Sequence, residues 1–273
     1  FIVATPIGNL DDISKRAIRV ISEADIVICE NPKHSLKLLN KLGIKKKLIS
    51  LHDYNENKVI EKLTENLLSK KIVLISDAGS PLISDPGYKL VKYCIDNNIN
   101  IVSIPGPASI IPALQLSGIP VNTFYFAGFF PKMKKQMLEY IKYIADCEKT
   151  SVFFVSSHKL YACLELLEIY LKKRSVSISK ELTKINEKVF WGLGSEIKNK
   201  IIVNKQNLKG EFVVVVEGKS LTKNDPNNLV KYSKEIKVLL SKFSLTDVVE
   251  IVHNLTGISK NKIYKWTLKL KKG

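Results

Sequence analysis

Short apolar runs alternate with amphipathic stretches through the first 118 residues of the chain. The runs have the length and continuous apolar character of strands buried on both faces, whereas the stretches between them show the three- and four-residue spacing of helices. This alternation predicts an α/β fold whose parallel sheet carries helices on both faces. The predicted strands begin at Phe1 and then cover residues 25–29, 48–51, 72–75 and 99–104; helical spacing covers residues 13–21, 35–42, 55–69, 88–95 and 110–116. Asp11 or Asp12 is the expected cap of the first helix, and Gly43 is expected to close the second.

A pause at Gly118 and Pro120 separates this half from a second one with a similar pattern. We therefore predict one α/β domain over residues 1–118 and another over residues 119–223. In the second domain we expect a strand and turn over residues 124–131, strands at 152–155, 176–179, 188–191 and 211–217, and a helix at 132–146. A second helix is expected to follow the segment 156–159, with His158 at its start, and to end at Leu171.

The last part of the chain is helical and basic. A polar linker is expected at residues 224–228, and the tail as a whole is assigned to residues 226–273. Within the tail, Ser244 to Leu255 and Asn261 to Leu270 have helical spacing, and a turn containing Gly257 joins them. Helix, glycine turn and helix predict a small helix-turn-helix-like unit.

The net charge of +17 lies mostly outside the first domain. Residues 1–118 carry 15 basic and 12 acidic side chains, residues 119–225 carry 18 and 11, and residues 226–273 carry 10 and 3. The excess of +7 in each of the last two segments would attract a polyanionic substrate such as RNA. The alternative is a compositional bias toward lysine, which would leave these side chains merely solvated.

The remaining composition describes an ordinary globular protein. The chain is 45% hydrophobic with a mean hydropathy near zero, and no apolar stretch reaches the length of a membrane span. No signal peptide is visible, and the four cysteines are scattered and expected to be reduced, so we expect a cytoplasmic protein without membrane contact. The four histidines show no ligand spacing, and no metal site is predicted.

Two loops rich in glycine and proline follow neighbouring predicted strands. Residues 76–87 read Ser-Asp-Ala-Gly-Ser-Pro-Leu-Ile-Ser-Asp-Pro-Gly, and residues 105–109 read Pro-Gly-Pro-Ala-Ser. Such loops leave the carboxyl ends of parallel strands, where open α/β sheets bind their ligands. Neither loop contains a phosphate-binding glycine motif. The alternative reading is a pair of tight turns without a ligand.

The opening Thr5-Pro6-Ile7-Gly8-Asn9-Leu10, taken with residues 76–87 and 104–109, resembles the tetrapyrrole methylase superfamily of S-adenosylmethionine enzymes. Within it, the chain is similar to the branch that methylates the ribose 2′-hydroxyl of a cytidine in 16S rRNA near the decoding site. The resemblance implies a two-domain fold with the active-site cleft between the domains and a helical tail. It also implies S-adenosylmethionine as cofactor, the small ribosomal subunit as substrate and a homodimer.

The resemblance and the loops together suggest the site residues. For the cofactor we expect Ile7, Gly8, Asp77, Gly79, Ser80, Pro81, Ile83, Ser109, Ile110, Ala127 and Gly128. Three carboxylates, those of Glu30, Asp85 and Glu181, are candidates for the base that accepts the hydroxyl proton, although an ordinary carboxylate is a weak base for it. Asp85 before Pro86 could instead be a turn former, and Glu30 and Glu181 could instead pair with Lys33 and Lys184.

Several positions depart from the family's motifs. Asn31 and Lys33 stand in a turn that otherwise matches at Glu30 and His34, Val155 stands where the family has glutamate, and lysine replaces arginine at positions 33, 159 and 180. Lysine keeps the charge but loses the planar fork that grips phosphate. The residues expected to bind RNA are Lys33, Lys159, Lys180, Lys184, Lys262 and Lys265. Two alternatives stay open: a catalytically impaired ribosome-binding homologue, and a tetrapyrrole C-methylase of the same superfamily.

Overall fold

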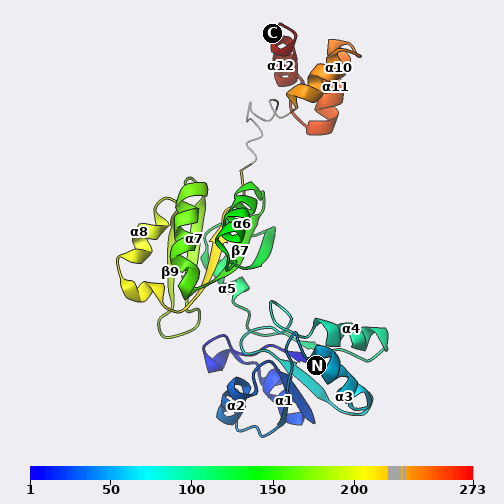
Figure 1. Ribbon diagram of the computed structural model, residues 1–273, viewed down its shortest axis with the longest axis vertical. Coiled ribbons are helices and arrows are strands. Elements are labelled where there is room, and N and C mark those ends of the chain that lie inside the picture. Colours follow the sequence, from blue (N-terminus) through cyan, green and yellow to red (C-terminus); the bar gives the residue numbers. More distant parts are fainter. Residues whose placement is uncertain (221–228, 230–231, 273) are drawn as a thin grey trace. The chain divides into compact units, whose positions relative to one another are not determined.

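The computed structural model describes residues 1–220, 229 and 232–272 of the chain. These residues form two compact units, Phe1–Lys219 and Ser220–Gly273 (Figure 1). The linker predicted at residues 224–228 lies outside the described residues.

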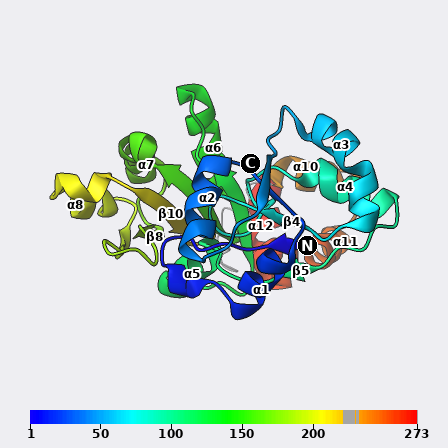
Figure 2. The ribbon, with the colours of Figure 1, turned by 90° about the horizontal axis from the view of Figure 1, so that it is seen from below.

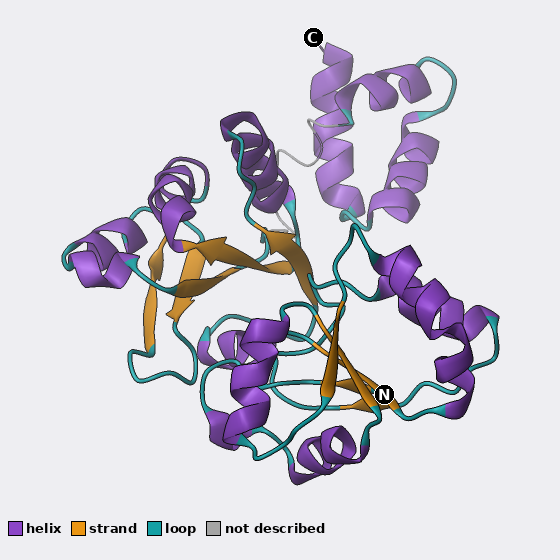
Figure 3. Ribbon diagram, turned by 60° about the horizontal axis from the view of Figure 1, so that its bottom comes forward, coloured by secondary structure: helices purple, strands orange, loops and turns teal. Residues whose placement is uncertain are grey.

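The first sheet is parallel throughout and has the strand order β3-β2-β4-β1-β5. The secondary structure predicted for this half is confirmed in outline, and helices flank the sheet on both sides (Figure 3). Its strands are β1 (Ile2–Val3), β2 (Ile26–Cys29), β3 (Lys47–Ser50), β4 (Ile72–Ile75) and β5 (Ser103–Ile104). Its helices are α1 (Lys15–Glu23), α2 (Pro32–Lys41), α3 (Glu56–Ser69) and α4 (Tyr88–Asp96).

The apolar runs are continuous because each strand is buried on both faces. In β2, Val27 and Cys29 pack with α1 and α2, whereas Ile26 and Ile28 pack with α3 and α4. The residues of β4 divide in the same way between the two cores. Successive side chains of a strand point to opposite faces, so one apolar run supplies both cores.

Three details of this half differ from the sequence-based expectation. The cap of α1 is Ser14, whose hydroxyl accepts from the Ala17 N–H, because Asp11 and Asp12 belong to a short 3-10 helix (Leu10–Asp12). The last strand pairs only over Ser103–Ile104, since its partner β1 is itself two residues long. Helix α2 begins at Pro32, with Asn31 as its cap.

The second sheet is mixed and has the order β6-β7-β10-β8-β9. Strand β6 runs parallel to β7, and the other pairs are antiparallel. One face packs against α6, α7 and α8 around Phe153, Ile178 and Val214 (Figure 2). The strands are β6 (Phe124–Phe129), β7 (Thr150–Ser156), β8 (Ser175–Lys180), β9 (Lys188–Leu193) and β10 (Glu211–Val216), and the helices are α6 (Lys134–Asp146), α7 (Ser157–Tyr170) and α8 (Ile197–Ile202). Helix α8 and the 3-10 helix after it (Lys205–Leu208) were not predicted.

The opposite face of this sheet packs against α5 (Ile110–Leu116). Ala113 and Leu114 of α5 join Val152, Val213 and Val215 in one core. Ile7, from the loop after β1, also packs against that core. The first and second halves of the unit are thus held together by apolar packing, and the boundary at residue 118 remains a prediction.

The second unit contains α10 (Ser233–Leu240), α11 (Leu245–Thr256) and α12 (Lys260–Lys272). Ser244 caps α11 through the Asp247 N–H, and Gly257 ends the helix in the left-handed conformation. Ile236, Val248, Val252 and Ile263 form the core. The two predicted helices are confirmed, and α10 is an addition. Within the described residues, no helix is both long and apolar enough to span a membrane.

Candidate ligand-binding and catalytic site

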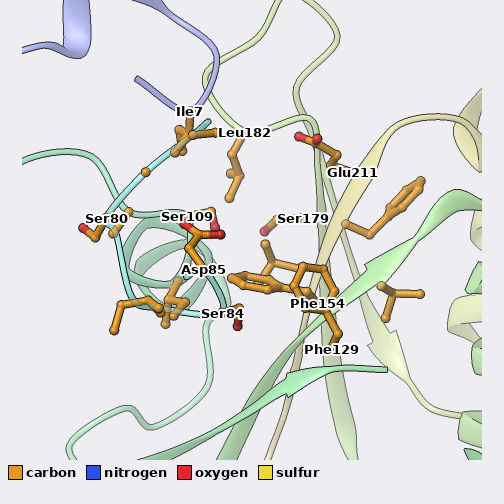
Figure 4. Close-up of a pocket in the computed structure, with 18 of the residues that line it drawn as sticks. Ile7, Ser80, Ser84, Asp85, Ser109, Phe129, Phe154, Ser179, Leu182 and Glu211 are labelled. Atoms are coloured by element: carbon orange, nitrogen blue, oxygen red, sulfur yellow. The ribbon is translucent and has the colours of Figure 1, made fainter. Parts of the chain in front are cut away.

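A cavity of about 390 Å³ lies between the loops of the first sheet and the α5 face of the second. One wall comes from residues 77–80, 83–85 and 108–110, at the carboxyl ends of β4 and β5. The other comes from β6, β7, β8 and β10, through side chains that include Phe129, Phe154 and Ser179. Figure 4 shows Asp85 and Ser109 on one side, with Ser179 and the two phenylalanine rings facing them. The volume falls within the usual range of small-molecule sites.

The loop at residues 76–87 is fixed to the strand that opens the chain. Thr5 and Gly79 exchange two backbone hydrogen bonds, of 2.8 and 3.0 Å, and the Ser76 hydroxyl donates to the Gly79 carbonyl at 2.9 Å. Gly79 has φ of +81°, and Leu82 and Ser84, which are not glycines, have φ of +69° and +70°. Left-handed backbone at non-glycine residues costs free energy and persists where the surroundings enforce it, which is common at functional sites.

The structure brings together seven of the eleven residues expected at the cofactor. Four others, Gly8, Pro81, Ala127 and Gly128, lie outside the cavity lining. Gly8 lies against Lys184 and Thr183 instead, where a side chain would collide, and Ala127 packs beside the core under α6 and α7. The seven that line the cavity are Ile7, Asp77, Gly79, Ser80, Ile83, Ser109 and Ile110.

The carboxylates of Glu30, Asp77 and Asp85 lie near one another at the first wall. Of the three predicted bases, only Asp85 lines the cavity. Burial, together with the nearby carboxylates of Glu30 and Asp77, raises the pKa of Asp85 from 3.8 to about 6, against the effect of a hydrogen bond with Ser76. Burial and Asp77 also raise the pKa of Glu30. The Asp77 carboxylate accepts from the Asn31 N–H at 3.3 Å. Asp85 is therefore a stronger base than an exposed aspartate and still ionised at neutral pH.

Glu181 has a different environment from the other predicted bases. It does not line the cavity; its carboxylate accepts from Lys184 Nζ at 3.0 Å and from the Glu211 N–H at 2.9 Å. Burial acts to raise its pKa, but these hydrogen bonds and the charge of Lys184 outweigh burial and lower the pKa. Glu181 therefore pairs with Lys184, which is the alternative role given for it above, and holds the loop at residues 181–184 in place.

Three of the six lysines predicted to bind RNA are engaged within the protein. Lys180 is only 6% exposed, and its Nζ donates to the Gln206 carbonyl at 2.7 Å. Lys159 Nζ donates to the Phe130 carbonyl at 2.8 Å, and Lys184 pairs with Glu181 and Glu211. Lys33 is exposed, and Lys262 and Lys265 lie on α12. A buried ammonium that already donates to a carbonyl is poorly placed for phosphate, so Lys180 is corrected to a structural role.

Two kinds of lining residue escaped the sequence analysis. The Ser179 hydroxyl is 1% exposed and has no hydrogen-bond partner among the described residues, although buried hydroxyls are normally paired. Phe129 and Phe154 supply aromatic rings to the second wall. The alternation of polar and apolar residues in β8 could have indicated that Ser177 and Ser179 share a face, but no sequence signal shows that the face opens onto a cavity.

Comparisons with known proteins agree with this geometry. The family model of the Tetrapyrrole (Corrin/Porphyrin) Methylases matches residues 1–198. The chain belongs to this family. Relatives named Ribosomal RNA small subunit methyltransferase I include one from Haemophilus influenzae, 36% identical over 98% of this chain and 95% of its own length. Another, from Escherichia coli O157:H7, is 35% identical over 98% of this chain and 94% of its own.

A solved structure supports the fold. The uroporphyrin-III-C-methyltransferase from Thermus thermophilus superposes with a TM-score of 0.54 at 16% identity, covering 79% of this chain and 92% of that one. At that identity the likeness concerns the fold alone. The tetrapyrrole methylase fold expected from the sequence is thereby confirmed.

The cavity suits S-adenosylmethionine, the methyl donor of this family. That molecule combines two cationic groups with hydroxyls and an aromatic base. The cavity offers the carboxylates of Asp77 and Asp85, the unpaired Ser179 hydroxyl, and the apolar side chains of Ile7 and Phe154. The cationic groups, the hydroxyls and the aromatic base of the donor therefore have matching partners in the lining.

Proposed function

We propose that this protein is an S-adenosylmethionine-dependent methyltransferase that modifies the ribose 2′-hydroxyl of a cytidine in 16S rRNA near the decoding site. The observation that carries the proposal is the similarity, over nearly the whole chain, to proteins named Ribosomal RNA small subunit methyltransferase I. The cavity adds independent support, because its volume suits a small molecule and its carboxylates complement the cationic groups of the methyl donor.

The reaction transfers a methyl group from the sulfonium of the bound donor to a ribose oxygen. The residues of this chain bind, orient and deprotonate. Gly79 and Ile7 bring backbone close to the ligand, Ser179 supplies a hydroxyl, and Asp77 and Asp85 complement positive charge. With its pKa of about 6, Asp85 is the best placed of the predicted bases to accept the hydroxyl proton. Alignment of the oxygen with the methyl group contributes the rest of the rate.

The departures from the family motifs do not argue for an inactive homologue. Asn31 is the cap of α2, its side chain accepting from the Lys33 N–H at 3.1 Å, and an aspartate would fill the same role. Val155 lines the cavity and is 2% exposed. A glutamate there would add a carboxylate to those of Asp77, Asp85 and Glu211 in the lining, and valine in its place leaves Asp85 as the predicted base that lines the cavity.

A tetrapyrrole C-methylase is the less favoured reading. The relatives at 35% and 36% identity are named Ribosomal RNA small subunit methyltransferase I, whereas the porphyrin enzyme is only 16% identical to this chain. The basic excess after residue 118 also favours a spread polyanion over a small porphyrinogen. We further propose that the protein acts in the cytoplasm as a homodimer on the small ribosomal subunit, as the resemblance implies.

The test is methylation of small ribosomal subunits from a strain that lacks this protein. Purified protein and methyl-labelled S-adenosylmethionine should label the 16S rRNA at one ribose. Label on a porphyrinogen but not on the subunit would support the C-methylase. Binding of cofactor and subunit without any transfer would support the inactive homologue.

A further inference from the structure

The turn between β6 and α6 presents an aromatic ring at the mouth of the cavity. Phe129 ends β6, the edge strand of the second sheet, and 58% of its surface is exposed although it lines the cavity. Its ring lies 5.1 Å from that of Phe154, which it meets at 59°. The Phe129 ring is therefore in contact with another aromatic side chain of the lining (Figure 4).

The turn that carries this ring is firmly held. The Phe130 N–H donates to the Phe154 carbonyl at 2.8 Å, and the Phe130 carbonyl accepts from Lys159 Nζ at 2.8 Å. The Phe130 side chain is 1% exposed and meets Tyr140 edge to face. Lys159 therefore positions this turn. An exposed aromatic residue on a rigid turn binds a ligand at little entropic cost.

Three lysines lie three to six residues after Phe129 along the chain. Lys132 precedes α6, and Lys134 and Lys135 form its first turn. All three are exposed, and none forms an ion pair within the part of the chain that the structure describes. Positive charge at a helix N-terminus is unfavourable for the helix, which indicates that the lysines serve something other than its stability.

We propose that the β6–α6 turn, defined as Phe129, Lys132, Lys134 and Lys135, is the docking element for single-stranded RNA, with Phe129 stacking on the base of the nucleotide to be methylated. The lysines contact phosphates that flank this base. The proposal rests on the proposed function and assigns the substrate side of the same cavity. None of these residues belongs to the RNA-binding set predicted from the sequence.

The chemistry of the substrate explains the position. In a nucleotide the base is joined to C1′ of the ribose, next to the carbon that bears the 2′-hydroxyl. A 2′-hydroxyl held in the cavity therefore places its base at the mouth. Single-stranded RNA is characteristically recognised by splayed bases stacked on aromatic rings beside a basic surface.

The charge of the turn selects RNA over a second copy of the chain as its occupant. Three lysines without an ion pair among the described residues, all within six residues of the ring, would repel an identical turn across a two-fold axis. They complement a polyanion. If the ring served the methyl donor instead, its loss would weaken cofactor binding, and this difference makes the proposal testable.

The experiment compares four variants of Phe129 with wild type in steady-state methylation of small ribosomal subunits. Phe129→Ala and Phe129→Leu remove the ring, and Phe129→Tyr and Phe129→Trp keep it. Phe124→Ala is the matched control, because Phe124 lies on the same strand, is 41% exposed and does not line the cavity. Isothermal titration with S-adenosylmethionine and thermal melting accompany each variant.

We expect the Ala and Leu variants to raise KM for the subunit about 5- to 100-fold, the range found for loss of one base–aromatic stack. Tyr and Trp should restore it, and cofactor affinity should stay within about twofold throughout. A wild-type KM in the Ala variant, restoration by Leu, or a parallel loss of cofactor affinity would each overturn the proposal. Failure of the wild-type enzyme to methylate would refute the proposed function instead, so the two failures are distinguishable.

The lysines are tested by their effect on salt dependence. The triple change to alanine at Lys132, Lys134 and Lys135 should reduce the slope of log affinity against log salt by about 2, since each single-strand phosphate contact contributes roughly 0.7. The control changes three exposed lysines on and after α3, Lys58, Lys62 and Lys70, which removes the same charge away from the cavity. Equal slopes for the two triple variants would contradict the proposal.

Discussion

Removal of the Asp85 charge is expected to stabilise the protein while slowing the reaction. In the folded protein this carboxylate has a pKa of about 6 instead of 3.8, chiefly because it is buried and then because Glu30 and Asp77 lie nearby. A tenfold change in an equilibrium corresponds to about 1.4 kcal/mol, so the unfavourable charge costs at most about 3 kcal/mol. Because solvent partly screens the group, we expect Asp85→Asn to add about 1–2 kcal/mol to the free energy of unfolding at pH 7.

The stabilisation expected for Asp85→Asn depends on pH. Below pH 3.8 the carboxyl is protonated in both the folded and the unfolded state, and the substitution should have little effect. Between pH 3.8 and about 6 the unfolded state loses its proton first, and the folded wild type becomes progressively less stable relative to the variant. Urea unfolding at pH 4 and pH 7 therefore measures the effect directly, with Asp12→Asn, at an exposed position, as control.

Activity should change in the opposite direction. If Asp85 accepts the hydroxyl proton, kcat for Asp85→Asn should fall by about 10²- to 10⁴-fold, and the wild-type rate should rise with pH through about 6. Equal unfolding free energies at pH 7, or a less stable variant, would refute the burial argument. A stabilised variant with wild-type kcat would refute only the catalytic role.

Three further predictions concern the cofactor loop, a buried lysine and the tail. Gly79→Ala should cost about 1–2 kcal/mol of stability through its φ of +81°, and should also weaken cofactor binding, measured by titration, because Gly79 lines the cavity and the loop would shift to relieve the strain. Gly43→Ala, with φ of +70° and open space around the Cβ, should cost similar stability without changing cofactor affinity. Lys180→Ala should lower the free energy of unfolding by about 1–3 kcal/mol, because the Gln206 carbonyl loses its donor, and should leave the RNA affinity of the folded protein unchanged. A loss of RNA affinity without destabilisation would instead support the prediction from sequence that Lys180 binds RNA. Deletion of residues 220–273 should leave cofactor affinity unchanged and reduce the salt dependence of RNA binding, and an unchanged salt slope would show that the tail does not contact RNA.

The sequence predicted the strands well because burial on both faces leaves a plain signal. Ile72–Ile75 is apolar at every position, and Glu211–Val216 is apolar in its last five, and both are central strands. Helix α8 (Ile197–Ile202) was missed because it is short and includes two lysines and an asparagine, so only Ile197 and Ile201 reveal its buried side. The cap of α1 was misassigned because two aspartates precede Ser14 and form a turn of their own.

The candidate site was predicted on one wall and largely missed on the other. Residues of the 76–87 loop are adjacent in sequence, so one motif indicates many of them. Ser179 and Phe129 come from separate strands and meet the loop only through the packing of α5 and Ile7 against the second sheet. The sequence could not separate structural lysines from exposed ones, because a positive charge in sequence does not show whether its side chain is buried, as Lys180 is, or exposed, as Lys132 is.

The central claim is tested most directly by mapping ribose methylation in 16S rRNA. Small subunits from cells lacking the protein would be incubated with the purified chain and S-adenosylmethionine, and protection of the RNA backbone from alkaline cleavage would be read at every nucleotide. We expect one newly protected position, at a cytidine near the decoding site, and its loss with Asp85→Asn. Methylation confined to a base, or no new protected ribose despite measurable cofactor binding, would contradict it.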